Sequence, residues 1–409
     1  MKKNKLIGSI LMVIGTSIGA GMLALPIISA NIGFTLSTIV IFISSLLMLL
    51  TGFLITEVNF AFPEYKNNFN TMAQVTLGSS GKFVSWLSSL LLLYAILSAY
   101  ILGNASLLTN LFIVFGINIP TWVNACLFVL VLGGVVYWST KAVDYLNRIL
   151  ISVKGVLLIS SFILLFPYVN ITTLARTMDV SIGSHFLAVI PIFIISFGFH
   201  SVIPTLRNYL GSKDSKELRI AIILGVLVSV VIYLLWLLVS LGSIPLNGEN
   251  SFSTLAKNKG SVGEFIQLIS VIINNKWVIF GINGFANVAM TTSFLGIAIG
   301  LFDFLAEGFK RSNSRKGRLQ TWFLTFIPPL TFALFYPKGF ILALGYSAIF
   351  ATVLWVILPA MMAYRLRKHP SLSSSYRVLG GKSLLVGIVM IGIGIIVLQI
   401  LINLNVITP

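Results

Sequence analysis

The stretch GTSIGAGMLALP, Gly15 to Pro26, lies within a long apolar run near the start of the 409-residue chain. Its glycines, hydroxyl residues and proline together weaken a continuous helix. A second stretch of the same kind, SFGFHSVIP, runs from Ser196 to Pro204. In a membrane, irregular backbone is tolerated only where it is buried in protein or lines a cavity, so two such breaks indicate a site.

The composition indicates that most of the chain lies in a bilayer. Hydrophobic residues make up 57% of the sequence and charged residues 9%, and the mean hydropathy is +1.02. Apolar stretches long enough to span a membrane recur along the whole chain. The eleven predicted spans are 6-30, 34-57, 83-112, 121-140, 149-168, 186-206, 219-243, 277-302, 319-336, 339-364 and 382-404.

Two segments and one residue need separate interpretation. The opening MKKNK and the apolar run after it resemble a signal peptide, but the run reaches about 25 residues and a second span follows directly, so it is kept as a span. The segment 253-275 is too polar to cross and is predicted to be an interfacial or external helix. Cys126 is the only cysteine, so no internal disulfide is possible.

The net charge of +17 is explained by topology. If the amino terminus is cytoplasmic, 21 of the 27 Lys and Arg residues fall on cytoplasmic segments and five on external ones, and Lys154 lies inside a span. The positive-inside rule therefore predicts a cytoplasmic amino terminus and an external carboxyl terminus. Because topology accounts for the basic loops, such as Lys310 to Arg318, we predict no nucleic-acid partner.

The two breaks fall in corresponding places if spans 1–5 and 6–10 form two repeats. Five spans is an odd number, so the repeats insert with opposite orientation. We predict an all-α membrane protein with a five-plus-five inverted repeat: residues 1-168, residues 186-364 and an accessory helix at 382-404. Opened helices expose N–H groups that favour a carboxylate and C=O groups that favour an ammonium, as in an amino acid. The alternative is that the small residues only allow close helix packing.

Lys154, in the run RILISVKGVLLIS, has no acidic residue nearby in sequence. Inserting a charged Lys at the centre of a span costs about 2.5 to 3.5 kcal/mol, so burial favours release of its proton. We therefore interpret it as the proton-coupling residue. Alternatively, Lys154 lies close enough to Arg148 for its side chain to reach the cytoplasmic interface.

The sequence resembles the hydroxy and aromatic amino acid permeases of the amino acid/polyamine/organocation superfamily, with the greatest likeness to tyrosine-specific permeases. The resemblance extends from the first span to the eleventh. It is carried by GTSIGAGMLALP, by SFGFH (Ser196 to His200), by TSFLGIAIGLFDFLAEGFKRSN (Thr292 to Asn313) and by GRLQTWFLTFIPPLTFALFYPKGFILALGYSA (Gly317 to Ala348).

The resemblance implies proton-driven import of an aromatic amino acid, tyrosine first, by alternating access in a bacterial-type inner membrane. In proton-coupled relatives a lysine at the position of Lys154 takes the place of a sodium ion. Thr292 and Ser293 resemble the hydroxyl ligands of a sodium site, so sodium coupling stays an alternative, and these hydroxyls are possible partners of Lys154. No cofactor is expected beyond the coupling ion, and the oligomeric state stays open.

A substrate phenol needs an apolar slot with a hydrogen-bonding end. His200 is a candidate for that end or for a proton relay. Tyr100 and Asn104 are four residues apart and share a helix face. Selectivity for tryptophan or phenylalanine stays open. The candidate substrate residues are Thr16, Ser17, Ile18, Gly19, Ala20, Gly21, Tyr100, Asn104, Ser196, Phe197, Gly198, Phe199, His200 and Tyr346.

Other function classes are less well supported. Gly15 to Gly19 matches G-x-S-x-G, so an intramembrane serine hydrolase with His200 as base is a remote alternative, but that motif belongs to a strand–turn–helix in soluble proteins. The sequence has no acidic ring or repeated filter typical of a channel. Its three histidines form no H-E-x-x-H motif, and no metal site is predicted. Glu57, at the cytoplasmic end of its span, is expected to pair with nearby basic groups or with interfacial water.

Overall fold

The computed structural model of the protein describes residues 2–63, 68–174, 182–211, 215–257, 260–369 and 372–407. Every regular element in these ranges is helical, and they contain no strand. Four basic residues used in the charge count, Lys66, Arg176, Lys213 and Lys259, lie outside the described residues. The prediction of an all-α protein is confirmed for the described part of the chain.

Residues up to 174 form α1 (Lys2–Ser17), α2 (Ala20–Ser29), α3 (Gly33–Asn59), α4 (Phe69–Val114), α5 (Thr121–Trp138), α6 (Thr140–Leu165), the 3-10 turn η2 (Phe166–Tyr168) and α7 (Ile171–Leu174). The remaining described residues form α8 (Ile182–Ser196), the 3-10 turn η3 (His200–Val202), α9 (Ile203–Leu210), α10 (Ser215–Ser243), α11 (Phe252–Lys257), α12 (Val262–Ile273), α13 (Lys276–Gly308), α14 (Arg315–Phe335), α15 (Phe340–Thr352), the π segment η4 (Val353–Ile357), α16 (Leu358–Leu366) and α17 (Gly381–Asn403).

The described part of the chain contains nine helices that are long and apolar enough to span a membrane. The count becomes ten if α1 and α2, which meet at a bend of 50°, are taken as one span. The predicted span 319-336 lies in α14, which has 21 residues but is less apolar, with a basic first turn and two prolines. The protein is therefore a multi-span membrane protein, and the count of eleven stays a prediction.

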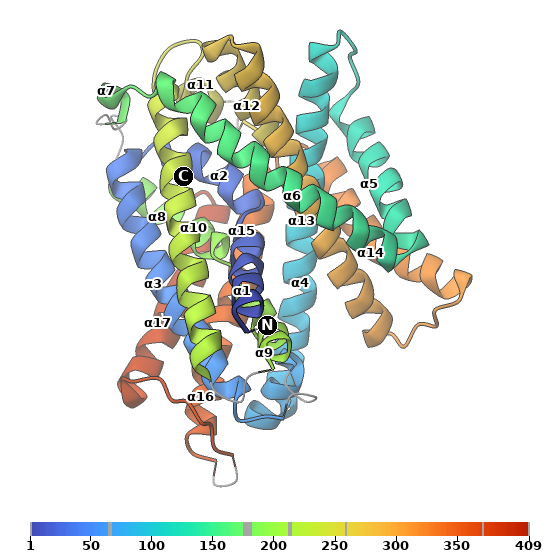
Figure 1. The fold of residues 1–409 in the computed structure, drawn as a ribbon, viewed down its shortest axis with the longest axis vertical. Helices are drawn as coiled ribbons and strands as arrows, with labels where there is room; N and C mark the ends of the chain where they lie inside the picture. Colours follow the sequence, from blue (N-terminus) through green and yellow to red (C-terminus); the bar gives the residue numbers. More distant parts are fainter. Residues whose placement is uncertain are drawn as a thin grey trace.

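The helices form one elongated bundle around α1, α4 and α13 (Figure 1). Helices α3, α8 and α17 lie on one side, and α5 and α14 lie on the other. Helix α6 crosses the front obliquely and packs along α13. Helices α7, α11 and α12 gather at the upper end, and the segment joining α16 to α17 lies at the lower end.

Local sequence explains two departures from the predicted bounds. Helix α4 begins at Phe69 rather than at residue 83, because Gly78 adopts a φ of +76° and joins a polar first segment to the apolar span. The segment 253-275 forms two helices rather than one. Of these, α12 starts with a capping box in which Ser261 and Glu264 satisfy each other's backbone N–H groups.

Candidate functional site

The first break lies between the end of α1 at Ser17 and the start of α2 at Ala20. A Cβ atom at Gly19 would lie 2.8 Å from the Tyr100 hydroxyl and 3.0 Å from the Ser293 Oγ. Glycine is therefore needed here for close approach rather than for a left-handed backbone, since φ is −153°. The break is held directly against α4 and α13.

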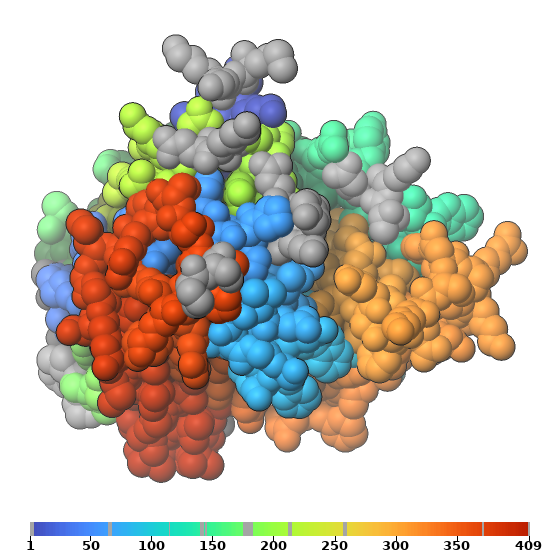
Figure 2. All heavy atoms as spheres, turned by 90° about the horizontal axis from the view of Figure 1, so that it is seen from below, coloured from blue at the N-terminus to red at the C-terminus, as the bar shows by residue number. Residues whose placement is uncertain are grey.

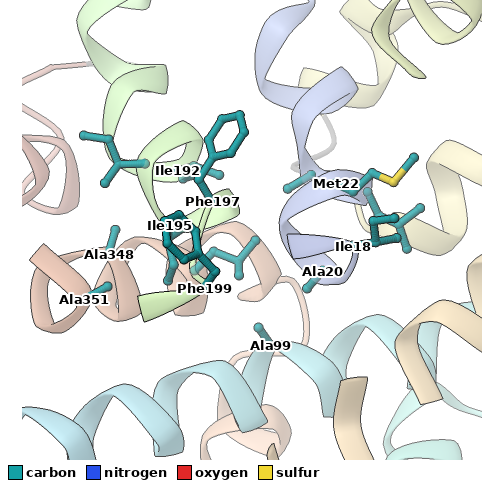
Figure 3. Close-up of a cluster of buried hydrophobic side chains, with 14 of the residues drawn as sticks. Ile18, Ala20, Met22, Ala99, Ile192, Ile195, Phe197, Phe199, Ala348 and Ala351 are labelled. Carbon is teal, nitrogen blue, oxygen red and sulfur yellow. The ribbon is translucent and has the colours of Figure 1, made fainter. Parts of the chain in front are cut away.

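The second break follows Ser196, the last residue of α8. Helix α8 packs against α2, the helix that begins at the first break. A Cβ atom at Gly21 would lie 3.0 Å from the Ser196 Cα, so α2 and α8 meet backbone to backbone. The two predicted breaks are thus neighbours in space. Figure 3 labels the surrounding side chains: Ile18, Ala20 and Met22 at the first break, Ile192, Ile195, Phe197 and Phe199 at the second, Ala99 on α4, and Ala348 and Ala351 on α15.

Two long polar side chains donate to carbonyl groups at these breaks. The Lys154 Nζ on α6 donates to the Ile18 carbonyl oxygen at 3.2 Å. The Tyr233 hydroxyl on α10 lies 2.6 Å from the Ser17 carbonyl oxygen and also contacts the Ser196 carbonyl oxygen. Lys154 is 6% exposed, so its amine lies against the first break and not at the cytoplasmic interface. The carboxyl ends of α1 and α8 therefore receive donors from two other helices.

The hydroxyl groups of α4 and α13 line the other side of the first break. The Tyr100 hydroxyl hydrogen-bonds to the Ser293 side chain and to the backbone of Ala20. Tyr100 and Asn104 are one turn apart, as predicted, and the Asn104 side chain donates to the Tyr100 carbonyl oxygen at 2.8 Å. The Thr292 hydroxyl donates to the Ala289 carbonyl oxygen of its own helix. In this structure the described bonds of Thr292 and Ser293 thus go to groups other than Lys154.

His200 directly follows Phe199 in the second break, as the first residue of η3, and is fully buried. Its Nε2 is 2.9 Å from the Thr51 hydroxyl on α3. Its ring stacks on Phe199 at 4.5 Å and on Trp355 at 5.7 Å. Within the described structure its Nδ1 has no hydrogen-bond partner. His200 is therefore held by contacts from α3, from Phe199 and from Trp355.

Aromatic side chains fill the region one turn from Tyr233 toward α12. Trp236 on α10 lies 5.7 Å from Phe285 on α13 and 6.3 Å from Phe265 on α12, measured between ring centroids. All three side chains are fully buried. Closely packed rings therefore separate the breaks from the end of the bundle that carries α11 and α12.

The opposite end is tied by charged groups. Arg367, just after α16, donates to both carboxylate oxygens of Glu57 at 2.7 and 2.8 Å, and the Val378 N–H donates to the same carboxylate at 2.8 Å. The hydrogen bond to Glu57 raises the pKa of the Arg367 guanidinium. Burial raises the pKa of the nearby Tyr376 phenol, whose ring lies under Arg219. Figure 2 views this end, where the red segment after α16 lies near the light-blue start of α4.

A second tie at this end connects α9 to the end of α3. The Arg207 Nη1 donates to the Asn59 carbonyl oxygen and, at 2.9 Å, to the Phe62 carbonyl oxygen. Its guanidinium also lies 4.3 Å from the Phe60 ring centroid. The pairing predicted for Glu57 is confirmed, and two separate sets of bonds from arginine side chains hold this end of the bundle together.

The structure brings most of the predicted site residues together around the two breaks. Thr16 faces its own helix, donating to the Val13 carbonyl oxygen at 2.8 Å. Tyr346 is 39% exposed, and no described contact joins it to the breaks. Ser17 donates to the Val13 carbonyl oxygen, and no described contact joins it to His200 as a hydrolase would require. Among the described residues, no group of three or more His, Cys, Asp or Glu side chains could hold a metal ion.

Tyr233 and Trp355 are the residues of this site that sequence reasoning missed. Each is an aromatic residue in a strongly apolar span, where packing is the ordinary role. Tyr233 gives one usable signal, because a phenol hydroxyl in the middle of a span must find a polar partner. Trp355 gives none, because its part in the site depends on where His200 lies.

Comparison with known proteins places the chain in a family. Residues 2–399 match the model of the tryptophan/tyrosine permease family. The chain belongs to this family. It is 34% identical to the tyrosine-specific transport system 2 of Haemophilus influenzae, covering 98% of each chain. It is 33% identical to the tryptophan-specific transport protein of Shigella flexneri, covering 98% of this chain and 96% of that protein.

A third relative is the low affinity tryptophan permease of Escherichia coli strain K12, 30% identical over 97% of this chain and 95% of that protein. These relatives are transport proteins, which confirms both the predicted family and the prediction that the chain is a transporter and not an enzyme. The aromatic amino acid permeases are thus the functional class of this membrane protein.

Proposed function

We propose that the protein imports an aromatic amino acid, tyrosine first, in symport with protons, using the paired breaks as its substrate site. The observation that carries the proposal is the placement of Lys154 against Ile18. Its amine donates to a carbonyl of the opened first span while being almost wholly buried. A buried amine held there by its hydrogen bond to Ile18 can exchange its proton when the breaks rearrange.

The break geometry supports recognition of an amino acid backbone. The carboxyl ends of α1 and α8 present carbonyl oxygens, which favour an ammonium group. The amino end of α2 at Ala20 presents N–H groups, which favour a carboxylate. Phe197 and Phe199 are fully buried beside these ends, so an aromatic substrate is expected to enter only when this packing opens.

Sodium coupling is the second candidate. The Ser293 hydroxyl and the carbonyls of the first break are oxygen ligands of the kind that cations bind. The Lys154 amine already donates to one of those carbonyl oxygens, that of Ile18. A charged Lys154 ammonium and a sodium ion bound to the same carbonyl groups would repel each other. We therefore favour the proton.

The helix contacts support the proposed inverted repeat. With α1–α2 equivalent to α8–α9, α3 to α10, α4 to α13, α5 to α14 and α6 to α15–α16, several of the main helix contacts have counterparts. Helix α6 packs on α13 as α15 packs on α4, and α1 packs on α10 as α8 packs on α3. We propose eleven spans on this scheme, with α14 crossing and α17 as the accessory helix.

We also propose a cytoplasmic amino terminus and an external carboxyl terminus in a bacterial inner membrane. The basic segment that joins α16 to α17 lies at the end of the bundle opposite α11 and α12 (Figure 1). This separation agrees with the distribution of Lys and Arg along the sequence.

The test is uptake of radiolabelled tyrosine, tryptophan and phenylalanine into proteoliposomes under an imposed proton gradient or sodium gradient. Lys154→Gln is measured beside the wild type, with Lys276→Gln, at the start of α13, as the matched control. We expect proton-driven accumulation of tyrosine that Lys154→Gln loses and Lys276→Gln keeps. Accumulation that follows the sodium gradient, or that survives in Lys154→Gln, would contradict the coupling mechanism. Stronger uptake of tryptophan than of tyrosine would change the substrate assignment only.

A further inference from the structure

The Tyr233 hydroxyl reaches both broken helices at once. It contacts the carbonyl oxygens of Ser17 and Ser196, which are the last residues of α1 and α8. The side chain is fully buried, and its ring packs edge-on against Phe197 with 5.0 Å between centroids. A phenol carries one hydrogen, so it can donate to the two oxygens only by sharing or alternating between them.

The position of these two carbonyl groups makes a donor necessary. The last carbonyls of a helix have no partner within the helix, and its carboxyl end carries partial negative charge. Here two such ends face one hydroxyl group in a buried setting where water is scarce. Lys154 donates to the next carbonyl along the chain, that of Ile18. Among the described residues, Tyr233 therefore supplies the side-chain hydroxyl that donates to the last carbonyls of both α1 and α8.

A substrate ammonium group would need the same oxygen atoms. It carries three hydrogens and a positive charge, so it can satisfy both carbonyls more fully than one shared hydroxyl hydrogen. When the substrate leaves, the carbonyls lose those donors while the helix ends stay buried. A transporter that accumulates its substrate must then return to the other side empty. An exchanger that swaps one substrate for another need not.

We propose that Tyr233 is the donor that lets the empty transporter return. Its hydroxyl holds the ends of α1 and α8 together when no substrate is bound, and the substrate ammonium takes over these carbonyls during loading. This inference rests on the proposed function, because it assigns Tyr233 a role toward the ammonium group of an amino acid. Tyr233 is a positioning residue, since it acts through the carbonyls of the broken helices.

Tyr233→Phe, which removes only the hydroxyl, should affect two modes of transport differently: net uptake, which requires the empty return, and exchange, which does not. We expect net uptake into empty proteoliposomes to fall by about tenfold, as an unsatisfied buried carbonyl slows the empty return. We expect exchange of external labelled tyrosine for internal unlabelled tyrosine to stay within about twofold of the wild type. Tyr94→Phe is the matched control. It removes a hydroxyl that donates to the Leu324 carbonyl oxygen at 2.7 Å, away from the breaks, and both modes should persist.

Equal loss of both modes in Tyr233→Phe, or full net uptake, would overturn the proposal. A second measurement uses the wild type with 3-(4-hydroxyphenyl)propanoate, which lacks the ammonium group. When this compound replaces tyrosine inside the proteoliposomes, we expect it not to support uptake of external labelled tyrosine by exchange. Exchange as fast as with internal tyrosine would also overturn the proposal. Failure of the proposed function has a different signature, because the wild type would then exchange no aromatic amino acid.

Discussion

Replacing Glu57 with glutamine tests whether the ion pair at the lower end keeps that end closed. Glu57 is 1% exposed and the Arg367 side chain 8% exposed. The carboxylate accepts two bonds from Arg367 and one from the Val378 N–H. Glutamine preserves the shape but removes the charge, and it places an NH₂ group where one oxygen accepted these donors.

The magnitude follows from burial. Removing one partner of a buried pair costs about 3 to 5 kcal/mol, because the other charge is left uncompensated. Taking the lower figure, the equilibrium for opening this end should shift by roughly 150-fold in Glu57→Gln. The raised pKa of Arg367 keeps its guanidinium charged at any accessible pH, so the effect should not depend on pH between about 6 and 9.

Cysteine labelling can measure this shift. Val378→Cys in a Cys126→Ser background places one thiol at a position that is 7% exposed in the closed arrangement. Its labelling rate with a membrane-impermeant maleimide, from the side where Arg367 lies, reports opening. We expect a rise of roughly 150-fold in Glu57→Gln and none in Glu307→Gln, which changes an exposed carboxylate on α13. A rise below about threefold in Glu57→Gln would refute the reasoning, since the ion pair would then contribute less than about 0.7 kcal/mol.

Two further substitutions test the contacts of the breaks. Gly21→Ala should reduce transport and destabilise the protein by about 1 to 3 kcal/mol, because the added Cβ would press on the backbone of α8. Gly15→Ala is the control, because a Cβ there has nothing within 4 Å, and it should leave both uptake and thermal unfolding unchanged. Thr51→Val should lower thermal stability by about 1 to 3 kcal/mol by removing the partner of the His200 Nε2. Thr352→Val removes a hydroxyl whose described hydrogen bond, to the Ala348 carbonyl oxygen, lies within its own helix, so it should change stability less. Equal losses in the two variants would count against the His200 contact.

The sequence was most informative where physical chemistry restricts a membrane helix most strongly. Both breaks were predicted from their Gly, Ser, Thr and Pro content, and α1 and α8 end within those stretches. A lysine inside a span is costly, so Lys154 was recognisable without a structure. Contacts between helices were less predictable, because they depend on how each helix is rotated about its axis. Tyr346 was proposed as part of the slot for the substrate ring because of its residue type, and the structure leaves it 39% exposed.

Helix lengths show the same limit. Hydropathy marks where a helix becomes apolar and not where it begins, so the polar residues from Phe69 onward were left out of α4. Likewise, Glu57 was expected to pair with a basic group, but the sequence did not identify the partner. Arg367 is 310 residues away, and only the packing of α16 beside α3 brings the two together.

The broken helix, Lys154 and Tyr233 are best understood as one arrangement. Each is unfavourable alone: an opened helix leaves carbonyls without partners, a buried amine lacks solvation, and a buried phenol needs an acceptor. Together, the carbonyls of Ser17 and Ile18 accept from the two side chains, so each group supplies what the others lack. Under the proposed mechanism, the ammonium group of the substrate, which carries N–H donors of the same kind, replaces these side chains at the carbonyls during loading, and the side chains take the carbonyls back when the substrate leaves.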